Sequence, residues 1–161
     1  MILILMGVCG SGKTIIGKAL AERLHSTFYD GDDFHPESNK EKMSRAVPLT
    51  DEERIPWLKK IREKIGECAA KNEPAIFGCS ALKTSYREIL LSGNLVTRLI
   101  HLTAPFEVIK ERLSARKGHF FNPALLTSQL DTLEVPDNAL TIDVTPPVEE
   151  VVATIANSLN D

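Results

Sequence analysis

The sequence of 161 residues has little cysteine, no long apolar run and no surplus of positive charge. Its three cysteines, Cys9, Cys68 and Cys79, form no CxxC pair and leave an odd number, so neither a disulfide framework nor a zinc site is indicated. The apolar run before Gly7 is too short for a membrane span or a secretory signal. We therefore expect a cytoplasmic protein with no membrane partner.

Charge and composition narrow the class of protein further. The chain carries 19 basic and 22 acidic residues, a net charge of -3, which argues against sequence-independent binding of nucleic acid. Its 43% hydrophobic and 25% charged residues are ordinary for a globular protein, and it contains no internal repeat. The length suits a single domain over residues 1–161.

Short apolar, β-rich runs alternate with segments of helical periodicity along the chain. Such alternation predicts an α/β fold, with three layers and a five-stranded parallel sheet between helices. Ligands of these sheets bind beyond the carboxyl ends of the strands. The strands are expected at 2–6, 27–29, 75–79, 96–102 and 140–144, and the helices after residue 14, around 37–43, and at 54–71, 85–91, 106–116, 123–133 and 148–159.

A GxxxxGK[ST] phosphate-binding loop (P-loop) directly follows the first predicted strand. A strand that feeds a glycine-rich turn and then a helix aims backbone N–H groups and the positive end of the helix dipole at one spot, where a phosphate chain binds. Lys13 is expected to reach the β- and γ-phosphates, and the Thr14 hydroxyl to be a ligand for Mg²⁺. The predicted nucleotide-binding loop consists of Gly7, Val8, Cys9, Gly10, Ser11, Gly12, Lys13 and Thr14.

Carboxylates follow the second predicted strand, at Asp30, Asp32 and Asp33. One of them can hold Mg²⁺ directly or through its waters, and another can accept a proton from an attacking hydroxyl. The alternative is a solvated acidic turn. The third predicted strand ends without the acidic residue that many P-loop proteins place there, which favours Asp30 and Asp32 as functional residues.

A basic segment, Arg112 to His119, ends the helix predicted at 106–116. Mobile basic segments of this type close over nucleotide phosphates and stabilise charge on the transferring phosphoryl group. The alternative is an exposed basic helix end that the helix dipole favours.

These segments together resemble the gluconate kinases (gluconokinases), small P-loop kinases similar in fold to shikimate kinase and the nucleoside monophosphate kinases. The resemblance covers nearly the whole chain. Beyond the P-loop, the matching residues are Asp30-Gly31-Asp32, His35-Pro36, Asn39, Lys42-Met43, Pro48-Leu49, Asp51, Arg54, Pro56-Trp57-Leu58, Cys79-Ser80-Ala81-Leu82-Lys83, Tyr86-Arg87 and Arg116-Lys117-Gly118-His119-Phe120.

The resemblance implies ATP-dependent phosphorylation of D-gluconate at its 6-hydroxyl, giving 6-phospho-D-gluconate, with ATP and Mg²⁺ as cofactors. It also implies a homodimer, a mobile lid at about 116–123 and a substrate-binding segment at about 32–56. Asp30 would order the waters of Mg²⁺ and Asp32 would deprotonate the acceptor hydroxyl. Arg116 would contact the transferring phosphate, and Arg112 and Pro146 would flank the adenine.

Gluconate has one carboxylate and a row of hydroxyls, so its pocket should combine cations with hydrogen-bonding groups. The candidates for the carboxylate are Arg54, Lys83 and Arg87, and those for the hydroxyls are His35 and Ser80. Alternatively, Arg54 is a surface helix residue, and Lys83 and Arg87 are ions on a helix face.

The chain departs from the gluconokinase pattern at two places, and two other functions remain as alternatives. The chain is a few residues shorter than expected before the last strand, and Cys9 replaces the more usual serine; neither change removes a catalytic group. One rival is a kinase for another small hydroxy acid such as shikimate. The other is a nucleotide-binding switch, which the lack of a DxxG motif disfavours.

Overall fold

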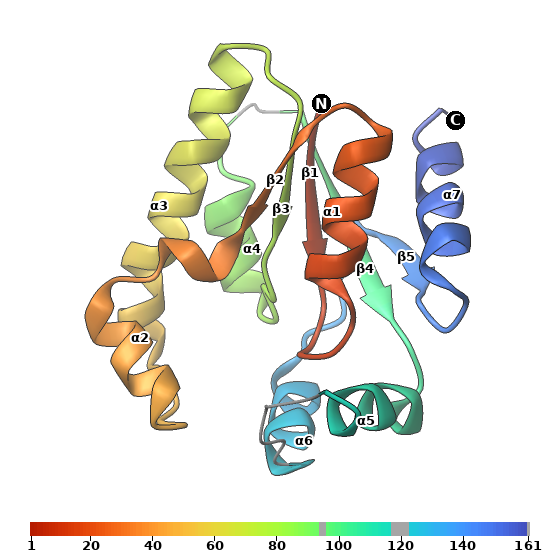
Figure 1. Ribbon diagram of the computed structural model, residues 1–161. Coiled ribbons are helices and arrows are strands. Elements are labelled where there is room, and N and C mark those ends of the chain that lie inside the picture. The colour runs from red at the N-terminus through yellow and green to blue at the C-terminus, as the bar shows by residue number, and fades with distance from the viewer. Residues whose placement is uncertain (94–95, 117–122, 161) are drawn as a thin grey trace.

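The computed structural model describes residues 1–93, 96–116 and 123–160, in which a parallel five-stranded sheet lies between two layers of helices (Figure 1). The strands lie in the order β2-β3-β1-β4-β5 and pair in parallel throughout. This arrangement confirms the predicted three-layer α/β fold. The strands are β1 (Ile2–Met6), β2 (Thr27–Asp30), β3 (Ala75–Gly78), β4 (Thr97–Thr103) and β5 (Leu140–Asp143).

The central strand is β1 because its residues are apolar on both faces. All of them are buried, and the strand pairs with β3 on one side and β4 on the other. A strand buried on both faces reads as a continuous hydrophobic run, which is the pattern expected for a parallel sheet covered on both sides.

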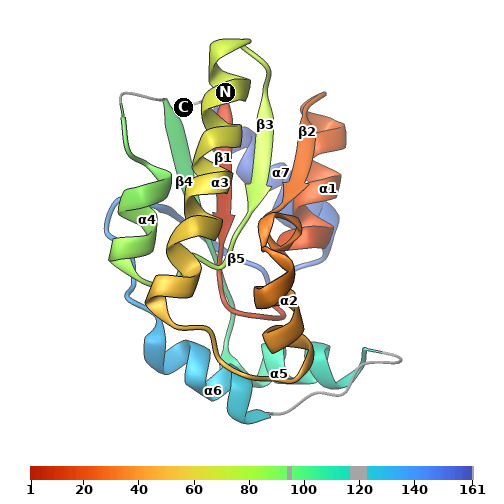
Figure 2. The same cartoon turned by 90° about the vertical axis from the view of Figure 1, so that its left-hand side faces the viewer.

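Two hydrophobic cores hold the helices to the sheet. Helices α1 (Lys13–Arg23) and α7 (Val148–Ser158) cover one face around Leu5 and Leu20, and α3 (Asp51–Ala70) and α4 (Thr84–Leu90) cover the other around Phe77 (Figures 1 and 2). Both cores contain residues of β1.

The remaining helices gather beyond the carboxyl ends of the strands. They are α2 (Glu37–Ser44), α5 (Phe106–Ser114) and α6 (Pro123–Thr132), all at the lower end of the molecule in Figure 1. A third hydrophobic cluster joins α5 and α6 to the loop after β1 through Val8, Leu113 and Leu126. The elements that can contact a ligand therefore surround one edge of the sheet.

Helix α3 starts earlier than predicted, at Asp51 instead of Arg54. The Thr50 hydroxyl accepts a hydrogen bond from the Glu53 amide at 3.2 Å, and the Glu53 carboxylate accepts one from the Thr50 amide at 3.0 Å. This capping box adds one turn. Pro56 consequently lies in the second turn of the helix, at the position of one missing backbone hydrogen bond.

Other boundaries lie close to those predicted. Most of the predicted basic lid, including Lys117, Gly118 and His119, falls outside the described residues, which reach Arg116 and resume at Pro123. In the part of the chain that the structure describes, no helix combines the length and the apolar character that a membrane span requires.

Candidate active site

The P-loop wraps tightly between β1 and α1. Gly10 and Gly12 adopt φ values of 79° and 90°, a left-handed conformation that glycine reaches without steric cost. The Lys13 ammonium donates hydrogen bonds to the carbonyl oxygens of Gly7 at 2.8 Å and Val8 at 3.0 Å. Burial lowers the pKa of Lys13. In this structure the lysine therefore lies across its own loop, and Thr14 is exposed in the first turn of α1.

Helix α6 contributes a side chain to the P-loop. The amide oxygen of Gln129 accepts a hydrogen bond from the Cys9 backbone N–H at 2.7 Å. Leu126, one turn earlier on α6, packs with Val8 in the third hydrophobic cluster. The loop that would hold the phosphates is thus supported from the far end of the chain by both a polar and an apolar contact.

Of the two predicted carboxylates near Lys13, Asp30 ends β2 and Asp32 lies just after it. Asp30 caps a short 3₁₀ helix, Gly31–Phe34, and its carboxylate accepts a hydrogen bond from the Asp32 backbone N–H at 3.0 Å. Although the Asp32 side chain is exposed, partial desolvation and then the Asp30 charge raise its pKa, and Lys13 opposes that rise. The structure therefore brings Lys13, Asp30 and Asp32 together.

The predicted substrate-binding segment is organised around His35. Its imidazole stacks on the Trp57 ring with 4.0 Å between centroids, and the indole N–H of Trp57 donates to the Gly31 carbonyl at 2.7 Å. The Asn39 side chain lies 3.1 Å from His35 Nδ1. Burial, followed by the charges of Arg54 and Lys40, lowers the pKa of His35 to about 4. His35 is therefore neutral near pH 7.

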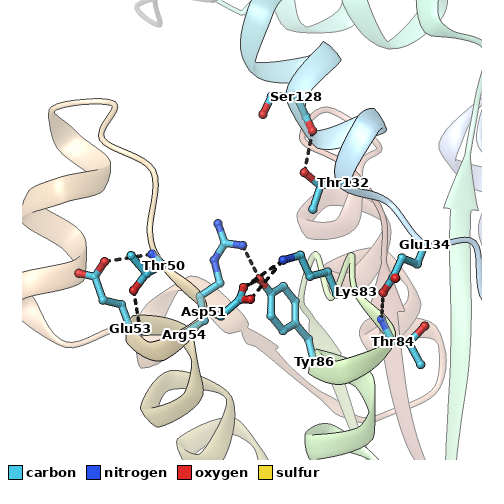
Figure 3. A network of polar contacts seen from close by, with 10 residues as sticks. All are labelled: Thr50, Asp51, Glu53, Arg54, Lys83, Thr84, Tyr86, Ser128, Thr132 and Glu134. Carbon is cyan, nitrogen blue, oxygen red and sulfur yellow. Dashed lines mark hydrogen bonds and ion pairs between the residues drawn. The ribbon is translucent and has the colours of Figure 1, made fainter.

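Arg54 and Lys83 meet around a carboxylate and a phenol (Figure 3). Arg54 Nη1 donates to the Tyr86 hydroxyl at 2.8 Å, the hydroxyl donates to Asp51 Oδ1, and Lys83 Nζ lies 3.1 Å from the same oxygen. Hydrogen bonds from Tyr86 and, to a smaller extent, from Lys83 hold the pKa of Asp51 below its ordinary value. Among the described residues no carboxylate forms an ion pair with Arg54.

Arg87 does not join this group. Its guanidinium is buried and donates to the carbonyl oxygens of Ala81 at 2.8 Å and Glu134 at 2.7 Å. Ala81 has a φ of 45°, an uncommon conformation for a residue other than glycine. Arg87 thus stabilises the turn after β3, and its expected contact with a substrate carboxylate stays a prediction. In that turn the Ser80 carbonyl accepts a hydrogen bond from the Gly7 N–H at 3.4 Å.

The predicted adenine-flanking residues also lie at this edge of the sheet. Arg112 Nη2 donates to the Thr145 carbonyl at 3.1 Å, next to Pro146 in the loop after β5. Arg116 is exposed just past the end of α5. Burial raises the pKa of the Cys9 thiol, and the charges of Lys13 and Arg116 partly offset that rise. Arg116 is therefore within electrostatic reach of the P-loop.

Several residues of the site were not among the predicted site residues. Asp51 lies three residues before the predicted Arg54 on α3, and Tyr86 lies three residues after the predicted Lys83 at the start of α4. Residues with this spacing share a helix face, a signal that the sequence did contain. For Gln129 no such signal exists, because 120 residues separate it from Cys9.

Comparisons with known proteins agree with the fold and with the P-loop. Residues 3–119 match a family described as AAA domain. The thermoresistant gluconokinase of Escherichia coli K12 is 42% identical over 156 residues, which cover 94% of this chain and 89% of that protein. A likeness to shikimate kinase from Bacteroides thetaiotaomicron, at 17% identity and a TM-score of 0.66, concerns the fold alone.

Two solved structures are similar over nearly their whole length. An unliganded sugar kinase from Janibacter sp. HTCC2649 has a TM-score of 0.90 at 40% identity, covering 99% of this chain and 94% of that one. A gluconokinase from Sinorhizobium meliloti 1021 has a TM-score of 0.81 at 39% identity, covering 98% and 94%. From its P-loop, its fold and these relatives, the chain belongs to the gluconokinase family of P-loop kinases.

Proposed function

We propose that the protein transfers the γ-phosphoryl group of ATP to the 6-hydroxyl of D-gluconate and releases 6-phospho-D-gluconate and ADP. The observation that carries this proposal is the continuity between two groups of residues. Asp32 beside Lys13 is linked through Gly31, Trp57 and His35 to the cationic pair Arg54 and Lys83. A phosphate donor and a carboxylate-bearing acceptor would then bind next to each other.

The transfer needs one proton acceptor and a set of positive charges. Asp32 takes the proton of the 6-hydroxyl as that oxygen bonds to the γ-phosphorus, and the bond from the γ-phosphorus to the bridging oxygen of ADP breaks. Its raised pKa suits it to proton transfer better than an ordinary aspartate. Lys13 would leave the loop carbonyls for the β- and γ-phosphates, with Arg116 on the transferring group.

The residues present also fit Mg²⁺. This cation prefers oxygen ligands, uses few carboxylates and keeps several waters. The exposed hydroxyl of Thr14 and the carboxylate of Asp30 offer such a set beside the P-loop, with Asp32 adjacent. When bound, Mg²⁺ would neutralise charge on the β- and γ-phosphates.

The acceptor carboxylate would bind to Arg54 and Lys83. A guanidinium presents paired N–H donors that match a carboxylate. Lys83 already pairs with Asp51, so Arg54 would make the main contact and Lys83 would add charge. His35 and Ser80 would contact hydroxyl groups of gluconate. We do not assign Arg87 to the carboxylate contact, because its guanidinium already donates to the carbonyl oxygens of Ala81 and Glu134.

A coupled ADP-release assay tests the proposal. With ATP and Mg²⁺, the protein is offered gluconate, shikimate, glycerate and nucleoside monophosphates, and the product is located by ³¹P and ¹³C NMR. We expect turnover with gluconate alone and phosphate on carbon 6. Turnover with shikimate and not gluconate, or tight nucleotide binding without any acceptor-dependent turnover, would overturn it.

A matched pair of variants on α3 tests the acceptor pocket. Arg54→Met should raise the KM for gluconate by about tenfold or more and leave the KM for ATP unchanged, since one charge-assisted contact is lost. Lys60→Met removes an exposed cation from the same helix and should change neither constant. Equal effects of the two variants would argue against a specific contact of Arg54 with the substrate.

A further inference from the structure

The Asn39 carboxamide joins His35 to the backbone of α3. Its Nδ2 donates to the Glu53 carbonyl oxygen at 3.0 Å and lies 3.1 Å from His35 Nδ1. A carbonyl oxygen can only accept, so the contact with Glu53 establishes which end of the carboxamide is the nitrogen. The second N–H of Asn39 then faces Nδ1, which must be the acceptor. In the neutral ring the proton therefore lies on Nε2.

The ring is also fixed in orientation. His35 is 7% exposed and Asn39 2%, and the ring stacks on Trp57 at an interplanar angle of 15°. The indole N–H of Trp57 donates a hydrogen bond to the Gly31 carbonyl, and the His35 backbone N–H donates one to the Asp32 carbonyl at 3.2 Å. Both aromatic side chains are thus tied to the backbone that carries the proposed catalytic Asp32.

One nitrogen of the ring is left for a ligand. His35 Nε2 has no hydrogen-bond partner among the described residues, yet it is not one of their fully buried unpartnered atoms. It therefore lies on the part of the side chain that remains accessible. The charged groups that act on the ring are Arg54 of α3 and Lys40 of α2, and both oppose a positive charge on it.

We propose that Asn39 holds His35 as the neutral Nε2–H tautomer, so that the ring donates a hydrogen bond to an acceptor hydroxyl oxygen and takes no proton from it. This inference rests on the proposed function for the identity of the acceptor, while the tautomer itself does not. It makes Asn39 a positioning residue and His35 a specificity residue. Proton removal is then left to Asp32.

The tautomer is measured without any substrate. Long-range ¹H–¹⁵N spectra of the free protein should show His35 protonated on Nε2 and unprotonated on Nδ1 at pH 7, with titration near pH 4 only. His25, exposed after α1, provides a reference signal in the same spectrum. An imidazolium or an Nδ1–H ring for His35 at pH 7 would overturn the proposal. A protein with the expected tautomer but no gluconate turnover would contradict only the proposed function.

Variants test the role of the tautomer in turnover. Asn39→Asp replaces the donor by a charged acceptor, which should move the His35 proton to Nδ1, raise its pKa and lower kcat/KM for gluconate about tenfold, the effect of one lost hydrogen bond. The KM for ATP should not change. Unaltered gluconate kinetics in a variant with a moved proton would contradict the inference.

Substitutions of His35 itself keep the inference testable if Asn39→Asp does not fold. His35→Gln retains an N–H near the position of Nε2 and has no titrating group. It should preserve most of kcat/KM for gluconate, whereas His35→Ala should lose about tenfold. If His35→Gln were as impaired as His35→Ala, with both variants folded by thermal melting, donation from Nε2 would be excluded.

Discussion

At the scale of single residues, Asp32 carries the proposed proton transfer. Asp32→Asn keeps the size of the side chain and the hydrogen bond from the backbone N–H of residue 32 to Asp30, but it cannot accept the proton. We expect kcat for gluconate phosphorylation to fall by about 10²–10⁴, the usual contribution of a general base. Nucleotide affinity, measured by fluorescence titration, should change little. A near-normal kcat would assign proton removal to another group.

The pKa of Asp32 determines the acid limb of the pH profile. Desolvation and the Asp30 charge raise this pKa above 3.8, so the protonated and inactive form persists to higher pH than for an ordinary aspartate. Activity should therefore fall as the pH drops through the raised value. Asp30→Asn removes one cause and should lower the pKa of Asp32 in the free protein, measured by ¹³C NMR titration. An unchanged or higher pKa would contradict this account.

Lys83 and Arg87 lie four residues apart, but we expect mutation of Arg87 to affect mainly stability and mutation of Lys83 to affect mainly substrate binding. Arg87→Met leaves the buried carbonyl of Ala81 without its donor, at about 1–3 kcal/mol, and also removes the donor of the partly buried Glu134 carbonyl, so it should lower the free energy of unfolding. Lys83→Met removes a partly exposed cation and should mainly raise the KM for gluconate. Chemical denaturation and steady-state kinetics separate the two effects. A large loss of stability in Lys83→Met would contradict the assignment of Lys83 to substrate binding.

At the scale of elements, the first turn of α3 links folding to the site. Thr50→Ala removes the hydroxyl of the capping box and should cost about 1 kcal/mol of stability. Because Asp51 and Arg54 lie in that turn, its fraying should also raise the KM for gluconate. The control is Thr154→Ala on α7, whose hydroxyl bonds only to the Glu150 carbonyl of its own helix. A gluconate KM unchanged in Thr50→Ala would show that the turn is held by other contacts.

The capping box also illustrates what apolar periodicity alone does not predict. Periodic apolar residues place the body of α3 correctly, but its start depends on Thr50 and Glu53, a polar pair outside that periodicity. The pattern Thr-x-x-Glu was present in the sequence. Reading it would have placed Asp51 and Arg54 on one helical turn, and with them the centre of the cationic group.

At the scale of the whole molecule, the parallel sheet explains which parts of the site could be predicted. Carboxyl ends of parallel strands share one edge, so the P-loop, Asp30 and the turn after β3 had to lie together once the strands were identified. The partners of Arg87 and Gln129 could not be predicted in this way. The contacts of Arg87 depend on the positive φ of Ala81 and on the distant Glu134. The contact of Gln129 depends on the packing of α6 against a loop that is distant in sequence.

We expect the packing of helix α6 against the P-loop to support nucleotide binding, and a variant of Leu126 tests this. Leu126 is fully buried against Val8 and Leu113, so Leu126→Ala should lose about 2–5 kcal/mol of stability. Since Gln129 follows one turn later and bonds to the Cys9 N–H, displacement of α6 should also weaken ATP binding. Leu125 is 53% exposed, and Leu125→Ala should change stability by less than about 0.5 kcal/mol. Denaturant unfolding and ATP titration measure both effects. A destabilised Leu126→Ala with wild-type ATP affinity would show that the P-loop keeps its conformation without α6.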